Sequence, residues 1–400
     1  MRDLTASQRK IIGSERHIWP NELAFAEAIY ADRLELIQQD MLARGLSVVI
    51  LFDPENMYWL TGYQTIGYFT FQAMCIPASG KPVIVTRVVN RDMALALPTI
   101  GNAIAVFDTQ DHVDILEAYL KDTVPTGQIG IDTTSRYLSI CDYTRLVDRL
   151  GGRFKPFINV IEAHRMVKTL CELDRMRAAA SAVKAGIDAA LKMIAVGKTD
   201  NDLAAALYQG SIAAGSEYIG HPPMVVTGPR SELCFALWKR NTIEKGDVVL
   251  LEGAGCVDRY HAMMSRSAVV GKATDEHKAT ADALVEILET AIDKIKPGVT
   301  AGEVDFACRQ KVEKRGLGQY FKSRTAYGIG IGFPPNWAEG HIYSLRPNDP
   351  MVLQPNMTFH VIPTMFRTGF GMAISDSVRV TEDGCEILTN YPRDLMEIDA

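Results

Sequence analysis

Two different arrangements of helix and strand divide this chain of 400 residues near residue 160. Up to that point, short apolar segments typical of buried strands alternate with segments whose apolar residues recur at helical spacing. This alternation is typical of an α/β domain. The helices and strands predicted beyond residue 160 do not alternate strictly, which indicates an α+β domain. Because a chain of this length exceeds what one hydrophobic core usually serves, we predict two domains, residues 1–160 and 161–400.

The predicted elements follow from the same periodicity. Residues 1–20 are polar and irregular, and we expect them to form an arm. In the first domain we predict helices over residues 21–44 and 113–120 and strands over 46–52, 74–76, 82–88, 103–107 and 128–132. In the second domain we predict helices over 166–194, 199–214, 275–294 and 301–315 and strands over 247–253, 262–270, 327–333, 358–363 and 372–381.

Charge and composition exclude several classes of protein. Lys and Arg number 42 against 48 Asp and Glu, a net charge of −6, so we expect no nucleic acid as a partner. The longest apolar runs have the length of strands and are too short to cross a membrane, and the first residues lack the pattern of a secretory signal. The seven cysteines form no Cys-x-x-Cys pair, which favours a reducing compartment. We therefore predict a cytoplasmic protein.

The segment from Gly246 to Arg266 carries the main functional signal. An apolar strand ends there in Glu252, which is followed by glycines and then by Arg259 and Arg266. A buried carboxylate without a partner is costly, which leaves two interpretations. Either Glu252 pairs with Arg259 or Arg266 across a hairpin, or it lies at the mouth of a pocket with a perturbed pKa. The spacing of the residues does not favour one over the other.

Motifs in both halves of the chain resemble the creatinase and aminopeptidase-P superfamily. Residues 54–63 are similar to its Asn-x-x-Tyr-Leu-Thr-Gly-aromatic signature. Further pieces match in order and spacing in the second half, namely Gly246-Asp247, Tyr260, Arg266 and the segments 328–330, 357–363 and 380–384. The resemblance implies an α/β creatinase-like domain at the N-terminus and an α+β catalytic domain with the pita-bread fold at the C-terminus.

The metallopeptidases of this superfamily hold two metal ions with five ligands, Asp, Asp, His, Glu and Glu. The resemblance places these positions at Glu252, Met263, Tyr327, Ile362 and Ser375. Met and Ile are poor partners for hard divalent cations, and one carboxylate with a Tyr and a Ser does not make a dinuclear site. Two histidines that face the substrate in the superfamily fall on Phe235 and Pro334. We therefore expect no metal and no other cofactor, and a metal-dependent Xaa-Pro peptidase is the least expected function.

Among superfamily members without a metal, the chain is most similar to the ectoine hydrolases. The similarity lies in Glu252 with its following glycines and in the segments 259–262, 327–331, 333–339, 344–347 and 358–360. In that family the glutamate that corresponds to Glu252 is the nucleophile that attacks a cyclic amidine. A creatinase-like amidinohydrolase is an alternative, although creatinases have a histidine and two carboxylates at the positions of Phe235, Ser265 and Ile362.

A buried carboxylate suits this reaction. A cyclic amidinium is a planar cation that a carboxylate binds through charge-assisted hydrogen bonds while it lies beside the electrophilic carbon. Glu252 would either attack this carbon to form an adduct that water resolves, or act as a general base on water. The sequence leaves both roles open. We predict a metal-independent hydrolase that cleaves a C–N bond of a small cyclic amidine or amide.

Other residues are expected to support Glu252. We predict His261 as catalytic from the shared Arg-Tyr-His motif, and His360 because it shares a strand face with Ile362, two residues on. For both, a histidine satisfied within the core is the structural alternative. For Asp376 we expect a surface position or an ion pair. The residues predicted to bind the substrate are Tyr63, Tyr68, Phe71, His221, Phe235, Tyr260, Tyr327, Trp337 and Glu339.

Residues 64–72 depart most from the ectoine hydrolases, which carry an Asp-Gly-Trp segment there. In the superfamily this region approaches the active site, commonly that of the partner subunit. The resemblance therefore implies a homodimer with its site near the subunit interface and a small-molecule substrate whose ring differs or is held differently. The alternative to an enzyme is a non-catalytic pita-bread protein that binds a peptide or a partner protein. An accessible pocket at Glu252 favours the enzyme, and a pocket filled by Met263, Phe235 and Ile362 favours the binding protein.

Overall fold

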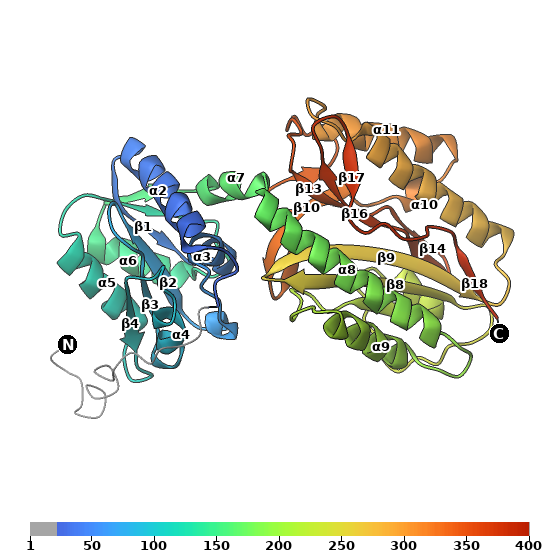
Figure 1. The fold of residues 1–400 in the computed structure, drawn as a ribbon, viewed down its shortest axis with the longest axis horizontal. Coiled ribbons are helices and arrows are strands. Elements are labelled where there is room, and N and C mark those ends of the chain that lie inside the picture. The colour runs from blue at the N-terminus through green and yellow to red at the C-terminus, as the bar shows by residue number, and fades with distance from the viewer. Residues whose placement is uncertain (1–21, 400) are drawn as a thin grey trace. The chain divides into compact units, whose positions relative to one another are not determined.

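The structure is a computed structural model that describes residues 22–399 (Figure 1). The arm expected for residues 1–20 lies outside these residues. Contacts within the chain divide it into two units, Met1–His164 and Arg165–Ala400. The division falls close to the expected boundary at residue 160.

The first unit is built on a six-stranded mixed sheet with the strand order β4-β3-β2-β1-β5-β6. Its strands are β1 (Leu46–Leu51), β2 (Gln72–Pro77), β3 (Val83–Arg87), β4 (Asn102–Val106), β5 (Gln128–Ile131) and β6 (Phe154–Pro156). Its helices are α2 (Glu27–Ala43), α3 (Pro54–Thr61), α4 (Arg91–Leu95), α5 (His112–Thr123), α6 (Ile140–Leu150) and α7 (Val160–Met166), with short 3-10 turns η1 (Ile66–Phe69) and η2 (Val88–Asn90). β2 is antiparallel to both of its neighbours, whereas the pairs β1–β5, β5–β6 and β3–β4 are parallel.

Local signals account for much of this unit. Asp111 caps α5 by accepting hydrogen bonds from backbone N–H groups, and Ser139 caps α6 in the same way. The apolar faces of these two helices pack on β1, β2, β3 and β5 and form one hydrophobic core. α2 begins at Glu27, later than predicted, and no side chain caps it, so periodicity did not locate its start.

The second unit contains a ten-stranded sheet whose main order is β17-β16-β13-β10-β9-β8-β7, with β11 and β12 paired to β10 and β18 paired to β9. Its strands are β7 (Met224–Thr227), β8 (Val248–Val257), β9 (Tyr260–Val270), β10 (Ala326–Phe333), β11 (Asn336–Ala338), β12 (Ser344–Leu345), β13 (Thr358–Val361), β14 (Thr364–Arg367), β15 (Phe370–Ala373), β16 (Asp376–Val380), β17 (Cys385–Ile387) and β18 (Met396–Ile398). Its helices are α8 (Leu170–Met193), α9 (Asp200–Ala213), α10 (Asp275–Lys294) and α11 (Ala301–Lys314), with 3-10 turns η3 (Gly228–Glu232) and η4 (Gly318–Tyr320). β14 and β15 form a separate hairpin.

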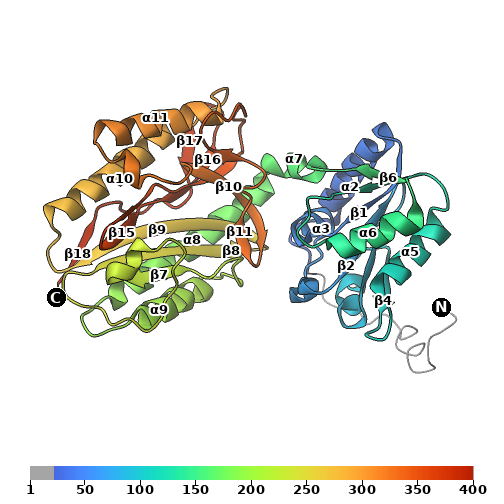
Figure 2. The same cartoon turned by 180° about the vertical axis from the view of Figure 1, so that it is seen from behind.

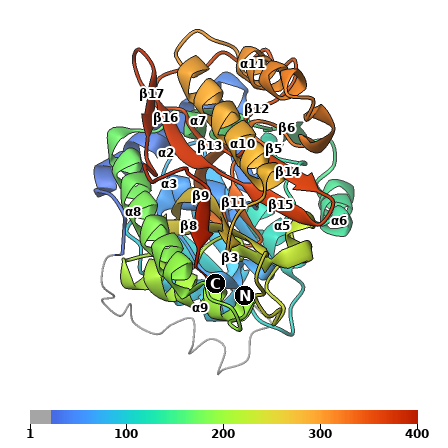
Figure 3. The ribbon, with the colours of Figure 1, turned by 90° about the vertical axis from the view of Figure 1, so that its right-hand side faces the viewer.

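Two layers of helices enclose this sheet (Figures 1, 2 and 3). Alternate residues of β8 point to opposite faces, so that Val249 and Leu251 pack in the core beneath α8 and α9 while Val248 packs in the core beneath α10 and α11. The helix pairs therefore cover opposite faces of the strands. Within residues 22–399, no helix is both long and apolar enough to span a bilayer.

The helix predicted over residues 166–194 is confirmed as α8, although it begins at Leu170, four residues later than predicted. Met166 instead ends the separate helix α7, and residues 167–169 lie between the two helices. Thr169 begins α8 with a capping box, in which its own backbone N–H donates to the Glu172 carboxylate at 2.7 Å. The backbone of Val167 pairs with that of Met357. The helical spacing of apolar residues continues through residues 167–169, so it does not reveal the cap at Thr169 or the backbone bridge at Val167.

The single strand predicted over residues 372–381 is wrong. It divides into β15 and β16, with Ile374 and Ser375 between them. At this break the backbone N–H of Ser375 donates to the carbonyl of Ser265 on β9, at 3.1 Å. The break turns the Ser375 side chain toward β9 and β13, which matters for the site below.

Candidate active site

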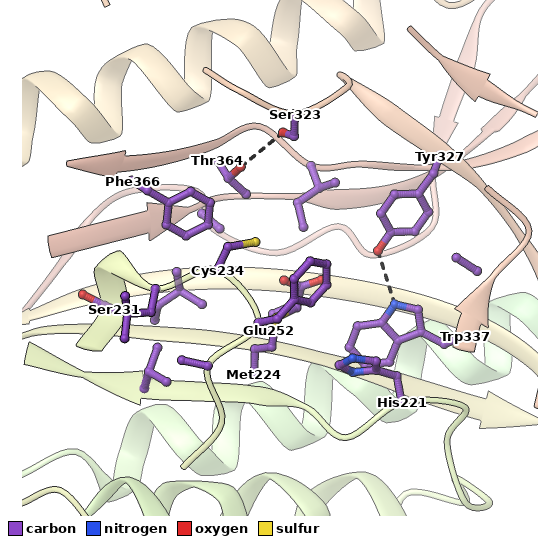
Figure 4. A pocket seen from close by; sticks show the side chains of 18 of the residues that line it. His221, Met224, Ser231, Cys234, Glu252, Ser323, Tyr327, Trp337, Thr364 and Phe366 are labelled. Carbon is purple, nitrogen blue, oxygen red and sulfur yellow. Dashed lines mark hydrogen bonds between the residues drawn. The ribbon is translucent and has the colours of Figure 1, made fainter. Parts of the chain in front are cut away.

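A cavity of about 260 Å³ lies within the second unit, among β7, β8, β11, β14, β15 and the start of β10 (Figure 4). Much of its wall is apolar, with aromatic rings from Phe235, Trp337 and Phe366. The polar or ionisable side chains that line it are His221, Ser231, Cys234, Glu252, Ser323, Arg324, Tyr327, Asn336, Trp337 and Thr364. The cavity is accessible, and neither Phe235 nor Ile362 fills it, which is the arrangement expected of an enzyme.

The alternation of β8 places Glu252 in this cavity. Leu250 and Glu252 share the face that lines it, whereas Val249 and Leu251 face the helices. Gly253 and Gly255, which follow Glu252, lie on the face of β8 that packs against α8 and α9. A Cβ at Gly255 would lie 2.0 Å from the backbone carbonyl oxygen of Ala179 in α8, so only glycine permits this close approach.

Burial dominates the electrostatics of Glu252. The side chain is 4% exposed, and desolvation raises its pKa from 4.5 to about 8. The hydroxyl of Ser265, directly opposite on β9, partly counteracts this rise. Near neutral pH the carboxyl is therefore mainly protonated, and a cation beside it would favour its ionised form.

Neither arginine of the hairpin pairs with Glu252, so the ion-pair interpretation is wrong and the pocket interpretation is confirmed. Arg266 is fully buried and its Nη2 contacts the Asp376 carboxylate at 3.0 Å. Arg259 donates from its guanidinium to the carbonyls of Gly332 and Tyr218. Asp376 thus forms the expected ion pair, although in the interior and not at the surface.

Tyr327 connects the cavity to His360. Trp337 donates from Nε1 to the Tyr327 hydroxyl at 3.3 Å (Figure 4), and His360 Nδ1 lies 2.7 Å from the same oxygen. His360 Nε2 lies 2.7 Å from the hydroxyl of Ser375. Burial, helped by the Arg266 charge, lowers the pKa of His360 to about 3, so the ring is neutral. His360 therefore lies next to the site, one side chain removed from the cavity.

The structure places His261 away from the cavity, which corrects its predicted catalytic role. Its Nε2 accepts the backbone N–H of Gly220 at 3.0 Å, and its Nδ1 lies 2.9 Å from the carbonyl of Arg259. Burial lowers the pKa of this histidine to about 3. Both ring nitrogens are engaged by backbone groups, so His261 positions the loop that carries His221.

Tyr260 and Glu339 also lie outside the cavity lining, contrary to prediction. The Tyr260 hydroxyl donates to Glu172 at 2.7 Å. Glu339 is buried between Arg165 and Lys168, with contacts of 2.6 and 2.7 Å. Burial raises the pKa of Glu339, but the two cations outweigh it and hold the pKa below its usual value. Both side chains complete buried polar clusters.

Three predicted rings meet at the rim of the cavity. His221 lies 4.8 Å from Trp337 and 6.3 Å from Phe235, measured between ring centroids. Phe235 is 71% exposed and has a φ of +63°, a region that bulky residues rarely adopt. An exposed aromatic ring held in strained backbone is typical of a binding site. His221, Phe235, Trp337 and Tyr327 therefore line the cavity, and their role in substrate binding stays a prediction.

Three further predicted rings belong to the first unit and pack there. Tyr63 and Tyr68 are buried, and Tyr68 packs edge-on against Tyr137. Phe71 lies 4.2 Å from His112, between ring centroids. These contacts are internal to the first unit, and the role of the three rings in substrate binding, which the resemblance implies for a partner subunit's site, stays a prediction. The expected homodimer stays a prediction, which light scattering would test.

Sequence reasoning missed Arg324 and Cys234, which both line the cavity. Arg324 lies before β10 and lines the cavity, with its guanidinium 5.2 Å from the Tyr327 ring centroid. Cys234 lies close enough to Glu252 for the carboxylate to raise its pKa further, beyond the effect of burial. Arg324 lies three residues before the predicted strand 327–333, in a loop, where periodicity does not predict the direction of a side chain. Nothing in the local sequence marks Cys234.

The sequence profile of "Metallopeptidase family M24" matches residues 174–382, and that of "Creatinase/Prolidase N-terminal domain" matches residues 33–167. The chain belongs to metallopeptidase family M24. This M24 protein is therefore a hydrolase, and its predicted architecture, a creatinase-like domain followed by a pita-bread domain, is confirmed.

Individual relatives of this M24 protein differ in the activity that their names give. Ectoine hydrolase of Halomonas elongata is 29% identical over 93% of this chain and 98% of its own length. Probable dipeptidase PepE of Mycobacterium tuberculosis is 27% identical over 94% and 98%. The recombinant prolidase of Thermococcus sibiricus has the same fold, with a TM-score of 0.83 at 23% identity, over 92% of this chain and 99% of that one.

The residues at the family's five metal positions do not fit a pair of metal ions. Met263 is fully buried, outside the cavity lining, and Ile362 presents only hydrocarbon. The hydroxyl of Ser375 is engaged by His360 and by the backbone of Ser265. Burial and then Glu252 hold the pKa of Tyr327 well above 10, so its hydroxyl stays protonated. Among residues 22–399, no group of three or more His, Cys, Asp or Glu side chains could hold a metal ion.

Proposed function

We propose that the protein hydrolyses a C–N bond of a small cyclic amidine without a metal ion, as an ectoine hydrolase-like enzyme. The observation that carries this proposal is Glu252, a buried carboxyl that lines an accessible cavity and has no cationic partner among the described residues. An amidinium supplies the cation that this carboxyl lacks. Its N–H groups are donors for a charge-assisted hydrogen bond to the carboxylate.

Arg324 supports a substrate that also carries a negative charge. Its guanidinium donates to the carbonyl of Gly340 at 3.1 Å, and no acidic side chain of the described residues pairs with it. Bidentate binding of a carboxylate is the usual role of such an arginine. A cyclic amidine with a carboxylate substituent would therefore place one charge at Glu252 and the other at Arg324.

The reaction follows from this placement in either of two ways. Glu252 attacks the amidine carbon and forms a covalent adduct that water resolves, or it takes a proton from the water that attacks that carbon. In both routes the apolar walls exclude bulk water and strengthen the interaction between the carboxylate and the cation. Ectoine, the substrate that the name of one relative gives, has this chemistry.

A substrate screen tests the proposed function directly. We expect ectoine or a related cyclic amidine carboxylate to raise the melting temperature and to be opened to an amide, as followed by NMR. Ligand at about a hundredfold excess over its dissociation constant stabilises a protein by about 2.7 kcal/mol. Creatine, a lactam and an Xaa-Pro dipeptide serve as comparison ligands.

The same screen is run with a chelator and with added Mn²⁺ or Co²⁺. Amidine hydrolysis is expected to be unchanged by the chelator. Hydrolysis of the dipeptide that depends on added metal would contradict the proposal and restore the peptidase function. Binding of an amidine without hydrolysis would support the non-catalytic alternative.

The activity is expected to rise with pH. Because burial raises the pKa of Glu252 to about 8, the reactive carboxylate of the free enzyme is the minor form at lower pH. The value of kcat/KM should increase about tenfold per pH unit between pH 6 and 7.5 and level off above pH 8. Steady-state rates over pH 6 to 9.5 check this, and a flat profile would contradict the role of Glu252.

A further inference from the structure

Four side chains form a hydrogen-bonded row that ends in the cavity, and the protons in this row can be counted. The row runs from Ser375 through His360 to Tyr327, with Trp337 as a second partner of Tyr327. Trp337 carries only a donor at Nε1, and a neutral histidine carries one donor and one acceptor. These restrictions assign the direction of each hydrogen bond.

Ser375 sets the direction at the buried end. Its hydroxyl oxygen already accepts the backbone N–H of Ser265 at 2.7 Å. His360 Nε2, at 2.7 Å, is the only acceptor within reach of the Ser375 proton among the described residues. If Nε2 carried the proton instead, this fully buried hydroxyl would keep a donor without an acceptor, which is unfavourable.

The tautomer of His360 follows. With Nε2 accepting from Ser375, the single proton of the neutral ring lies on Nδ1 and is donated to the Tyr327 oxygen at 2.7 Å. Trp337 donates to the same oxygen at 3.3 Å. Both lone pairs of the phenol oxygen are then occupied. The phenol proton then has no acceptor among the described residues, and the space left for it is the cavity that Tyr327 lines together with Glu252 (Figure 4).

We propose that Tyr327 is the proton donor of this site and that His360 and Ser375 are positioning residues that hold its hydroxyl in the donating orientation. This inference rests on the proposed function, because a proton donor needs a leaving nitrogen. In the adduct that water forms with the amidine carbon, the Tyr327 proton passes to the ring nitrogen. The C–N bond breaks and its electron pair stays on that nitrogen.

The remaining protons balance. The phenolate that Tyr327 becomes is held by the N–H groups of His360 and Trp337, which both already point at its oxygen. It takes back a proton from the hydroxyl of the adduct, and that oxygen becomes the carbonyl of the product amide. The proton that Glu252 took from the attacking water passes to the product amine. The products are an amide and an ammonium group, and Glu252 and Tyr327 are both restored.

The proton arrangement is testable without any substrate. We expect ¹⁵N NMR of the histidine-labelled full chain to show His360 protonated at Nδ1 and bare at Nε2 between pH 6 and 8, with His360→Asn used to assign its signals. Ser375→Ala should shift this population toward the other tautomer. A wild-type His360 protonated at Nε2 would overturn the proposal, whatever the substrate is.

The kinetic test uses the leaving group. Tyr327→Phe should lower kcat on a cyclic alkyl amidine by about 10²- to 10⁴-fold with KM within about threefold, as for loss of a general acid. An amidine with an arylamine leaving group needs less protonation, so the deficit there should shrink at least tenfold. Equal deficits for both amidines would overturn the donor role. Tyr208→Phe, a ring outside the cavity lining, serves as the matched control.

The positioning role of His360 has its own readout. His360→Asn keeps an N–H near the position of Nδ1, whereas His360→Leu has no donor. We expect the Asn variant to retain at least tenfold more kcat than the Leu variant at equal melting temperature. Equal kcat in both would overturn the positioning role. If the wild-type enzyme opened no amidine at all, the proposed function would fail, while the NMR measurement would still decide the orientation of Tyr327.

Discussion

The Glu252→Gln variant is expected to lose turnover by about 10³-fold or more while it keeps its fold. Glutamine has the size of glutamate and keeps hydrogen-bonding atoms, but it is neither a nucleophile of the same kind nor a base. Because the carboxyl lines the cavity and no arginine depends on it, the exchange leaves no buried charge unpaired. Rates on an active cyclic amidine measure the loss.

Stability separates this loss from unfolding. Burial raises the folded-state pKa of Glu252 to about 8, so its favourable contribution is complete below pH 4.5 and is lost as the pH rises through 8. Above pH 8 the glutamine variant should therefore melt at the same or a higher temperature than the wild type. Glu382→Gln, at an exposed position, is the matched control. Substantial activity in the Glu252→Gln variant would contradict the proposed mechanism.

The Asp376→Ala variant is expected to lower the free energy of unfolding of the second unit by about 3 to 5 kcal/mol. Asp376 is fully buried and contacts Arg266 at 3.0 Å and Arg393 at 2.8 Å. Removal of the carboxylate leaves Arg266 as an uncompensated charge in the interior. Denaturant unfolding followed by circular dichroism measures the effect.

A double variant tests the cause. Arg266→Met combined with Asp376→Leu removes both charges, and it should recover a large part of the stability that Asp376→Ala loses. Asp394→Asn, an exposed aspartate nearby in sequence, should stay within about 0.5 kcal/mol of the wild type. A change below about 1 kcal/mol in Asp376→Ala would show that the carbonyl partners of Arg266 suffice without the ion pair.

Much of the fold could be predicted because its signals are local. The alternation in β8 and β9 and the stripes of α10 and α11 depend on residues a few positions apart, and the structure contains these elements close to the predicted bounds. The errors lie where a distant segment acts. Ser375 breaks a predicted strand because its backbone bonds to Ser265, more than a hundred residues earlier. Periodicity does not contain that contact.

In the candidate site, too, the errors lie where contacts with distant residues decide the role of a side chain. His261, Tyr260 and Glu339 lie in segments that resemble the ectoine hydrolases, but such a resemblance does not tell which partners a side chain's hydrogen bonds reach. In the structure their polar atoms are engaged by Gly220, by Glu172 and by the pair Arg165 and Lys168. Arg324 lines the cavity from a loop, where periodicity does not predict the direction of a side chain.

By itself, the sequence determined the two-domain architecture and singled out Glu252 as the candidate catalytic residue, because residue types and strand periodicity are properties of the chain. Only the tertiary structure decided that Arg266 pairs with Asp376 and leaves Glu252 to the cavity. It also decided that His360 contacts Tyr327, which lines the cavity. Both depend on burial and on hydrogen-bond partners from strands far apart in sequence, and these set the charge and the proton positions of a group.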